Sequence, residues 1–252
     1  MSPILRSFIR WNIRCSNAFD RLLPEDYRVD GNSDFRRGFV DRWLRPGVRI
    51  ADIGGGKNPF INAGRKVELG AYVTGIDISA SELANAPVGA YDATVCADIG
   101  RYQGTADADL CICQAVLEHV QDVEAAFHSI AGTLKVGGVA LIFVPSRNAV
   151  FARLNLLLPE GLKRWLLHTI FPQSASDQGF RSYYDRCTPR DFTRLAAASG
   201  MVVEEARHYY VSAYFTFLVP LHMVWRAWVV LFRRVAGTQA AETFSMALRK
   251  VT

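Results

Sequence analysis

The sequence has few cysteines, and their spacing excludes two classes of protein. The five cysteines are an odd number and form no C-x-x-C pair. Disulfide-stapled secreted domains carry an even and dense set, and zinc ribbons need paired cysteines. We therefore expect neither class, and we expect a reducing compartment. Cys111 and Cys113 point to the same side of a predicted buried strand, which favours inert core residues.

The first segment lacks the unbroken apolar core of a secretory signal, because Arg6, Arg10 and Arg14 interrupt it. We therefore expect a cytoplasmic protein. Apolar residues such as Ile4, Phe8 and Trp11 recur there at helical spacing, and the arginines form a second stripe. Two interpretations stay open: a helix packed on the domain with a solvated basic face, or a helix on a membrane surface.

Polar, lysine-rich runs typical of nucleic-acid binders are also missing. The net charge of +5 divides into +4 for residues 1–50, −6 for 51–146 and +7 for 147–252. The basic residues of the outer segments lie among Trp, Leu and Phe rather than among polar residues. This combination favours an anionic membrane surface over nucleic acid as a partner.

Neither a repeat nor a low-complexity linker is visible, and from residue 48 short apolar strands alternate with helices. The expected strands are Val48–Ile53, Ala71–Ile76, Ala93–Ala97, Asp109–Cys113, Val139–Val144, Met201–His208 and Phe244–Val251. The expected helices are 33–45 with Ser33 as its N-cap, Ala115–Leu134 and Pro189–Ser199. The alternation predicts an α/β fold whose parallel sheet is covered on both faces. We expect a helical appendage, 1–47, and a second domain, 48–252.

The first strand ends in Asp52-Ile53-Gly54-Gly55-Gly56, a turn that lets a ligand approach the backbone closely. A dinucleotide fingerprint is excluded because Pro59 occupies its third glycine position, and no Gly-Lys-Ser/Thr follows to make a P-loop. The next two strands end in Asp77 and in Asp98-Ile99. Helix capping explains either aspartate alone, but the ordered set indicates a nucleoside site at one edge of the sheet.

With these residues the chain resembles class I S-adenosylmethionine-dependent methyltransferases of the small-molecule subgroup, including envelope-glycan and quinone-pathway O-methyltransferases. The glycine turn and the two strand-end aspartates carry the resemblance. Further matching stretches are Asp109–Gln114, Val116–Val120 and Leu134–Gly138. The chain departs from the family pattern at Asn58, where a third glycine is usual.

The resemblance implies a Rossmann-like, seven-stranded, mostly parallel sheet with an antiparallel last strand and helices on both faces. It implies S-adenosylmethionine as cofactor, and the acidic middle segment suits that sulfonium cation. The implied cofactor contacts are Asp52, Gly54, Gly55, Gly56, Asp77, Ile78, Asp98, Ile99 and Gln114. Quinone-pathway relatives can hold a metal here, but one of their acids aligns with Ala115, so no metal is expected.

His119 follows the fourth strand and is the candidate general base for an oxygen acceptor. The alternative is that Glu118 and His119 only orient the next helix. Within an insertion at 147–187, Tyr183, Tyr184 and Arg186 are the predicted acceptor contacts, with a plain surface loop as the alternative.

Two apolar stretches complete the pattern: Leu154–Phe171 and 210–232, the latter inside a second insertion at 210–236. The strands on either side of 210–232 belong to one sheet, so a single membrane crossing is excluded. Pro220 predicts a kink or a helical hairpin, and Arg226, Arg233 and Arg234 are expected to reach lipid headgroups. A dimer interface or a hydrophobic lid is the alternative.

These observations together predict a methyltransferase that is peripheral to the inner face of the membrane. Its expected acceptor is an oxygen on an amphipathic or lipid-linked molecule, such as a glycan precursor or a quinone. The alternatives are a soluble, possibly homodimeric enzyme for a small natural product, and a non-catalytic subunit that binds a partner.

Overall fold

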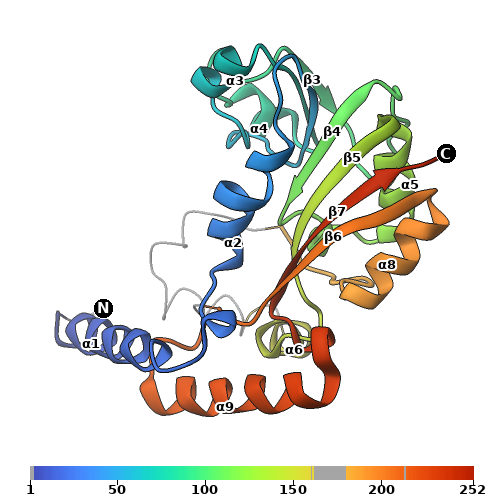
Figure 1. Cartoon of the computed structure of the whole chain (residues 1–252). Coiled ribbons are helices and arrows are strands. Elements are labelled where there is room, and N and C mark those ends of the chain that lie inside the picture. The colour runs from blue at the N-terminus through green and yellow to red at the C-terminus, as the bar shows by residue number, and fades with distance from the viewer. Residues whose placement is uncertain (1–2, 160, 162–179, 213) are drawn as a thin grey trace.

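A seven-stranded sheet forms the centre of the computed structural model, which describes residues 3–159, 161, 180–212 and 214–252 (Figure 1). The strands are β1 (Arg49–Ile53), β2 (Tyr72–Asp77), β3 (Ala93–Cys96), β4 (Ala108–Gln114), β5 (Leu134–Pro145), β6 (Met201–Tyr209) and β7 (Thr243–Lys250). Their order is β3-β2-β1-β4-β5-β7-β6. The pairs from β3 to β5 are parallel, and β7 runs antiparallel to β5 and β6. The predicted fold class is therefore confirmed.

Helical segments cover both faces of this sheet. The helices are α1 (Pro3–Asp20), α2 (Gly31–Asp34), α3 (Ala63–Leu69), α4 (Ala80–Ala84), α5 (Val123–Thr133), α6 (Val150–Leu157), α8 (Pro189–Ala198) and α9 (Val219–Ala236). Along β4, Leu110 and Ile112 face one core cluster, and Cys111 and Cys113 face the other. This alternation follows from the two-residue period of a strand, and burial on both faces explains its apolar sequence.

The predicted helix Ala115–Leu134 is wrong over its first eight residues, because α5 begins only at Val123. Ala115 has a left-handed backbone (φ +55°), and its N–H donates to the carbonyl oxygen of Phe143 on β5. A short 3-10 turn follows at Leu117–His119, and the Asp122 side chain caps α5. The non-local bond to β5 thus holds residues 115–122 as a loop at the edge of the sheet.

The predicted helix 33–45 is three short pieces: α2, a π-helical turn at Phe35–Phe39 and a 3-10 turn at Asp41–Trp43. The N-cap is Asp30 rather than Ser33, since the Asp30 carboxylate accepts a hydrogen bond from the Ser33 N–H at 2.7 Å. Phe35 and Phe39 are fully buried in the core cluster of the sheet. This part of the predicted appendage therefore packs into the core.

The apolar stretch 210–232 forms most of α9, and two expectations about it are wrong. Pro220 lies in the first helical turn, where its missing N–H costs nothing, so it begins the helix instead of kinking it. Arg226 does not reach towards solvent, since its side chain is 1% exposed and forms an ion pair with Asp20 at 3.0 Å. Its guanidinium also donates to the carbonyl oxygens of Tyr27 and Tyr210.

The second apolar stretch, Leu154–Phe171, is covered only at its beginning, by the end of α6. Its residues 160 and 162–171 lie outside the described residues, as do 172–179 of the predicted 147–187 insertion. Among the helices that the structure describes, none combines the length and the apolar character needed to cross a bilayer.

Candidate active site

A cavity of about 680 Å³ opens at the carboxyl ends of β1, β2 and β4, beside the residues that follow β3. Its wall includes Gly54, Asp77, Asp98 and His119, which come from four different segments. Open parallel sheets bind ligands at this edge, where the strand order changes direction. This cavity is therefore the candidate site.

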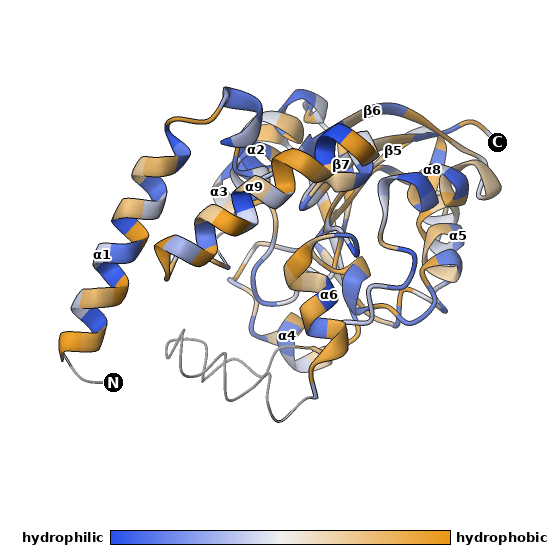
Figure 2. Ribbon diagram, turned by 90° about the horizontal axis from the view of Figure 1, so that it is seen from below, coloured by the Kyte–Doolittle hydropathy of each residue, from blue (hydrophilic) through white to orange (hydrophobic). Residues whose placement is uncertain are grey.

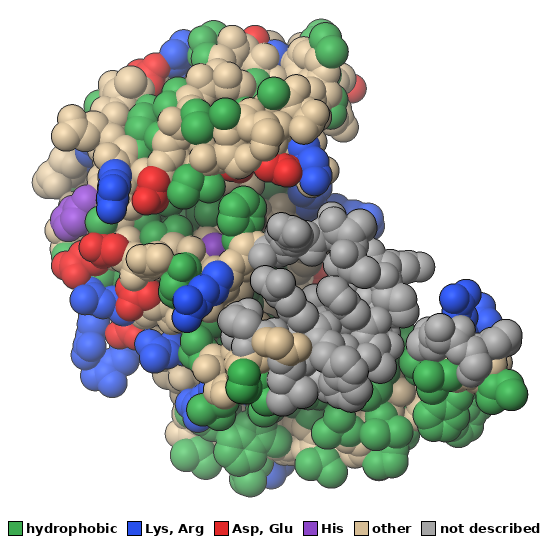
Figure 3. Space-filling view, turned by 180° about the vertical axis from the view of Figure 1, so that it is seen from behind, with side chains coloured by type: hydrophobic (Ala, Val, Ile, Leu, Met, Phe, Trp, Pro, Cys, Tyr) green, Lys and Arg blue, Asp and Glu red, His purple; other side chains and the backbone are tan. Residues whose placement is uncertain are grey.

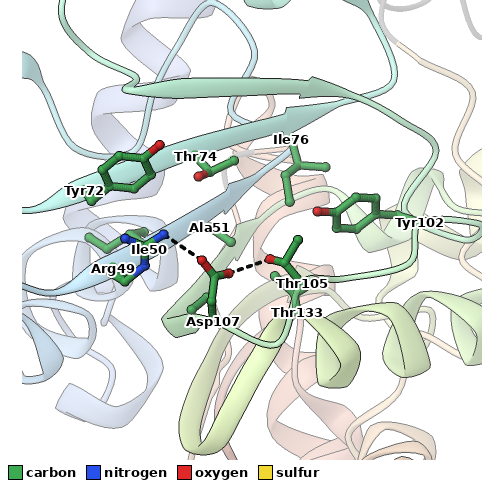
Figure 4. Close-up of a pocket in the computed structure, with 11 residues that line it drawn as sticks. Arg49, Ile50, Ala51, Tyr72, Thr74, Ile76, Tyr102, Thr105, Asp107 and Thr133 are labelled. Carbon is green, nitrogen blue, oxygen red and sulfur yellow. Dashed lines mark hydrogen bonds and ion pairs between the residues drawn. The ribbon is translucent and has the colours of Figure 1, made fainter.

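A second cavity lies at the opposite ends of the same strands and is far smaller, at about 20 Å³ (Figure 4). Arg49 and Asp107 form an ion pair across it at 2.6 Å, and the Thr105 hydroxyl donates to the same carboxylate (Figure 4). This volume has room for about one water molecule, so it offers no place for a nucleoside.

Gly54 of the glycine turn lines the large cavity, and the geometry of the turn requires glycine. Gly54 and Gly56 have positive φ angles of +73° and +48°. A Cβ atom on Gly54 would lie 2.3 Å from Cγ2 of Val116, and one on Gly56 would lie 3.0 Å from Oδ2 of Asp77. Glycine at these two positions therefore lets Val116 and Asp77 pack closely against the turn.

Asp77 presents a carboxylate at the end of β2, next to this turn. Its side chain is only 9% exposed, and Oδ1 accepts a hydrogen bond from the Ser79 N–H at 2.8 Å. Burial raises the pKa of Asp77 above its usual value, although the Ser79 N–H partly offsets this. An anchored carboxylate on a cavity wall is a suitable acceptor for a pair of ribose hydroxyls.

Asp98 and Ile99 form the next part of the wall. The Asp98 Oδ1 accepts a hydrogen bond from the Gly100 N–H at 2.9 Å, while much of its side chain stays exposed. Ile99 is buried and Ile78 is exposed, and both line the cavity. The arrangement combines apolar surface for a flat ring with a hydrogen-bond acceptor at its edge.

His119 lines the cavity from the 3-10 turn after β4. Its Nδ1 lies 3.1 Å from the carbonyl oxygen of Arg181, and because a carbonyl only accepts, the proton belongs on Nδ1. Burial lowers the pKa of His119, which keeps the ring neutral at neutral pH. Nε2 is then the basic nitrogen, 3.8 Å from Oε1 of Glu118.

Comparison with known proteins finds a family match for part of this chain. Residues 51–142 match the family described as "Methyltransferase domain". A ubiquinone biosynthesis O-methyltransferase of Bradyrhizobium sp. (strain ORS 278) is 29% identical over 168 residues, covering 63% of this chain and 60% of that relative. The protein of the same name from Nitrobacter winogradskyi is 32% identical over 168 residues, covering 63% of this chain and 58% of that relative. The chain thus matches about 60% of the length of these relatives.

Solved structures show the same fold. An S-adenosylmethionine-dependent methyltransferase from Mesorhizobium loti superimposes with a TM-score of 0.57 at 18% identity, covering 86% of this chain and 98% of that one. A Burkholderia thailandensis N1-methyltransferase with bound S-adenosylhomocysteine gives 0.51 at 14% identity, with coverages of 88% and 79%. This chain therefore has the fold of S-adenosylmethionine-dependent methyltransferases, and its residues 51–142 match a methyltransferase domain. Its segment 51–142 holds the glycine turn, Asp77, Asp98 and His119.

Four predicted cofactor residues, Asp52, Gly55, Gly56 and Gln114, are not among the residues that line the cavity. Asp52 is buried, and its Oδ2 accepts hydrogen bonds from the Phe60 N–H at 2.7 Å and the Tyr91 hydroxyl at 3.3 Å. Burial raises the pKa of Asp52 to about 6. Gly55 packs against Asp52, and Gln114 bonds to Asn32 and Arg36. In this position they shape the loop, and cofactor contact stays a prediction for them.

The predicted acceptor contacts separate into two groups. Tyr183 lines the cavity, and its hydroxyl accepts a hydrogen bond from Gln121 Nε2 at 2.8 Å. Tyr184 is buried outside the lining, and Arg186 forms an ion pair with Glu124 at 2.5 Å. Of the three, the structure therefore brings only Tyr183 to the cavity.

Sequence reasoning missed several residues at or near the site. Phe180 and Arg181 line the cavity and lie in an irregular segment with no pattern that could reveal them. Arg36 donates from Nε to Gln114 Oε1 at 3.0 Å and lowers the pKa of Asp52 through its charge. An arginine opposite a strand-end Gln is a non-local pairing, so no sequence signal could have found it. Among the described residues, no group of three or more His, Cys, Asp or Glu is arranged to hold a metal ion.

Proposed function

We propose that this protein transfers the methyl group of S-adenosylmethionine to an oxygen of an amphipathic acceptor. The observation that carries the proposal is that Asp77 and the neutral His119 line the same cavity. A carboxylate is suited to hold the nucleoside, and a neutral imidazole is suited to take a proton from a hydroxyl. Asp77 lies beside Gly56 of the glycine turn.

The residues present fit the cofactor. Gly54 brings bare backbone to the cavity wall, and Asp77 offers an acceptor for the ribose. When bound, S-adenosylmethionine supplies an electrophilic methyl group on a sulfonium cation. The protein then has mainly to align the acceptor with that methyl group.

His119 is the proposed base on the acceptor side. Its Nε2 takes the proton of the acceptor hydroxyl, while the Arg181 carbonyl oxygen holds Nδ1–H and fixes the ring. Phe180 and Tyr183 add aromatic surface to the same wall. Aromatic walls favour an acceptor with an apolar or ring-shaped part.

The relatives favour a quinone-type acceptor over a glycan precursor, since their names give ubiquinone biosynthesis as their role. A hydroxylated ring with an apolar tail has the amphipathic character we expect. We further propose that such an acceptor reaches the cavity from a membrane surface, with the protein bound there peripherally.

A methyl-transfer assay tests the proposal directly. Purified protein, labelled S-adenosylmethionine and a prenylated catechol in mixed micelles should give labelled product, and His119→Asn should slow it at least about tenfold. A prenylated ring without a free hydroxyl is the matched control. Failure to bind S-adenosylhomocysteine in calorimetry, or transfer to the control ring at the same rate, would refute the proposed O-methylation.

A further inference from the structure

Helix α1 is attached to α9 by polar contacts. Asn12 Oδ1 accepts a hydrogen bond from the Val219 N–H at 3.0 Å, and the Ser16 hydroxyl donates to the Thr216 carbonyl oxygen at 3.0 Å. One turn further on, Asp20 Oδ1 lies 3.0 Å from both His222 Nε2 and Arg226 Nε. Asn12, Ser16 and Asp20 follow one another at four-residue spacing and therefore form one face of the helix. This polar face is directed inward.

The exposed surface of α1 includes a stripe of large apolar residues, which is unusual for a surface helix. Ile4 is 83% exposed, Phe8 is 50% exposed and Trp11 is 61% exposed. Their spacing of four and three residues places them in one stripe. A helix in water normally buries its apolar stripe and leaves its polar stripe exposed. The contacts of Asn12, Ser16 and Asp20 hold α1 with its apolar stripe exposed. Contact with water alone does not explain this orientation.

Helix α9 adds a second exposed apolar stripe. Its inner side is buried through His222, Trp225, Arg226 and Val229. Its outer side repeats large apolar residues every three or four positions. These are Leu221, Val224, Trp228, Leu231 and Val235, between 38% and 81% exposed.

The two helices lie side by side on one face of the molecule. Figure 2 looks onto this face and shows α1 and α9 with apolar residues along them, and the two helices are in contact. In Figure 3 hydrophobic side chains gather along the lower edge of the molecule, where α9 lies in Figure 1. We call the outward stripes of α1 and α9, together with Arg6, Arg10 and Arg14, the α1–α9 surface.

The charge on these helices indicates which partner suits this surface. α1, α6 and α9 contain seven arginines and a single acidic residue, Asp20, which is turned inward to His222 and Arg226. Arg6, Arg10 and Arg14 are exposed and form a stripe beside the apolar one. A second copy of the chain would bring the same positive charge to the contact, which disfavours self-association. An anionic lipid surface complements both the charge and the apolar stripes.

We propose that the α1–α9 surface docks on a bilayer that contains anionic lipid. Trp11 and Trp228 lie at headgroup level, and the three arginines of α1 contact phosphate groups. This inference rests on the proposed function, because docking on a bilayer would bring an amphipathic acceptor to the cavity. It identifies which residues meet the lipid.

Vesicle sedimentation tests this docking surface with a matched pair of variants. The full chain should sediment with vesicles of phosphatidylglycerol and phosphatidylcholine at low salt, and much less with phosphatidylcholine alone. Val224→Ser with Val235→Ser should weaken this binding about tenfold or more. The control, Val67→Ser with Val88→Ser, changes two valines outside α1 and α9 that are at least as exposed, and it should leave binding unchanged. Circular dichroism confirms that each variant is folded.

The arginines are tested separately. Arg6→Gln, Arg10→Gln and Arg14→Gln together should abolish the preference for anionic vesicles and reduce the salt dependence of binding. Intrinsic fluorescence should shift to the blue on vesicle binding, and Trp11→Phe should remove part of that shift. Trp225→Phe should not change it, since Trp225 is 3% exposed and packed inside.

Three results would overturn the inference. The first is that the protein does not sediment with anionic vesicles at low salt. The second is that both valine pairs lose vesicle binding equally. The third is that ultracentrifugation shows a dimer, which Val224→Ser with Val235→Ser dissociates and the control pair does not. The last result would make this surface a protein interface. Calorimetry with S-adenosylhomocysteine in lipid-free buffer is run on the same samples. Retained nucleoside binding without vesicle binding refutes the docking surface alone, whereas loss of nucleoside binding refutes the proposed function.

Discussion

At the scale of single residues, Asp77 has the clearest expected effect on the cofactor. Asp77→Asn keeps the shape of the side chain but removes the charge that the ribose hydroxyls would meet. We expect the affinity for S-adenosylhomocysteine to fall about tenfold to a hundredfold, the size of a hydrogen bond to a charged group. Calorimetry measures this. Asp98→Asn is the matched control and should cost less, because the Asp98 side chain is 45% exposed and screened by water.

The proposed role of His119 predicts how the methyl-transfer rate depends on pH. Burial lowers the pKa of His119 below its usual value, and the imidazole acts as a base only when unprotonated. The methyl-transfer rate at saturating substrates should therefore be flat from pH 7 upward and fall in acid, with a midpoint below about 6.5. His119→Asn should remove this acid limb and slow transfer while leaving nucleoside affinity unchanged. An unchanged pH profile in His119→Asn would show that another group is the base.

At the scale of elements, the strands were predictable and the connections were not. The segment Val48–Ile53 is an apolar run that ends in glycines, and β1 lies within one residue of the predicted bounds. Ala115 carries no local sign of its left-handed backbone, which depends on the hydrogen bond to Phe143. The sequence therefore indicated a helix where a loop is found.

The same distinction applies to the candidate site. Gly54 and Asp77 follow predicted strands, so their place at one sheet edge could be anticipated. Tyr184 and Arg186 lie in a loop whose direction is set by distant partners: the Glu118 carbonyl oxygen accepts from the Tyr184 N–H, and Glu124 pairs with Arg186. Only the folded chain decides which of these neighbouring side chains reaches the cavity.

The contact between α1 and α9 gives a prediction about stability. Asp20→Asn removes the charge that faces Arg226, whose side chain is 1% exposed. Leaving a buried guanidinium without its counterion should lower the free energy of unfolding by about 3 kcal/mol. Asp26→Asn breaks another aspartate–arginine pair to α9, but this carboxylate is 71% exposed. Loss of this exposed ion pair should lower the free energy of unfolding by less than about 1 kcal/mol. Urea unfolding of both variants measures the difference, and equal losses would contradict this account.

At the scale of the whole molecule, buried acids make stability depend on pH in an unusual direction. Burial raises the pKa of Asp52 to about 6, of Glu242 to about 7 and of Glu118 to about 8. Each group binds its proton more tightly in the folded than in the unfolded chain. The contribution of these groups to stability is therefore complete at acid pH and is lost as pH rises from the unfolded to the folded pKa.

Glu118 should show this effect most strongly, since its Oε2 has no hydrogen-bond partner within the described part of the chain. Glu118→Gln replaces a carboxyl that must ionise in a buried site with a neutral group of the same shape. Between pH 5.5 and pH 8 the variant should gain about 2–3 kcal/mol of unfolding free energy relative to the parent protein, because only the parent loses stability over that range. Glu124→Gln, at an exposed ion pair, should show no such trend. Urea unfolding at several pH values measures both, and a gain for Glu118→Gln that is constant with pH would mean that the carboxyl is already ionised in the folded protein.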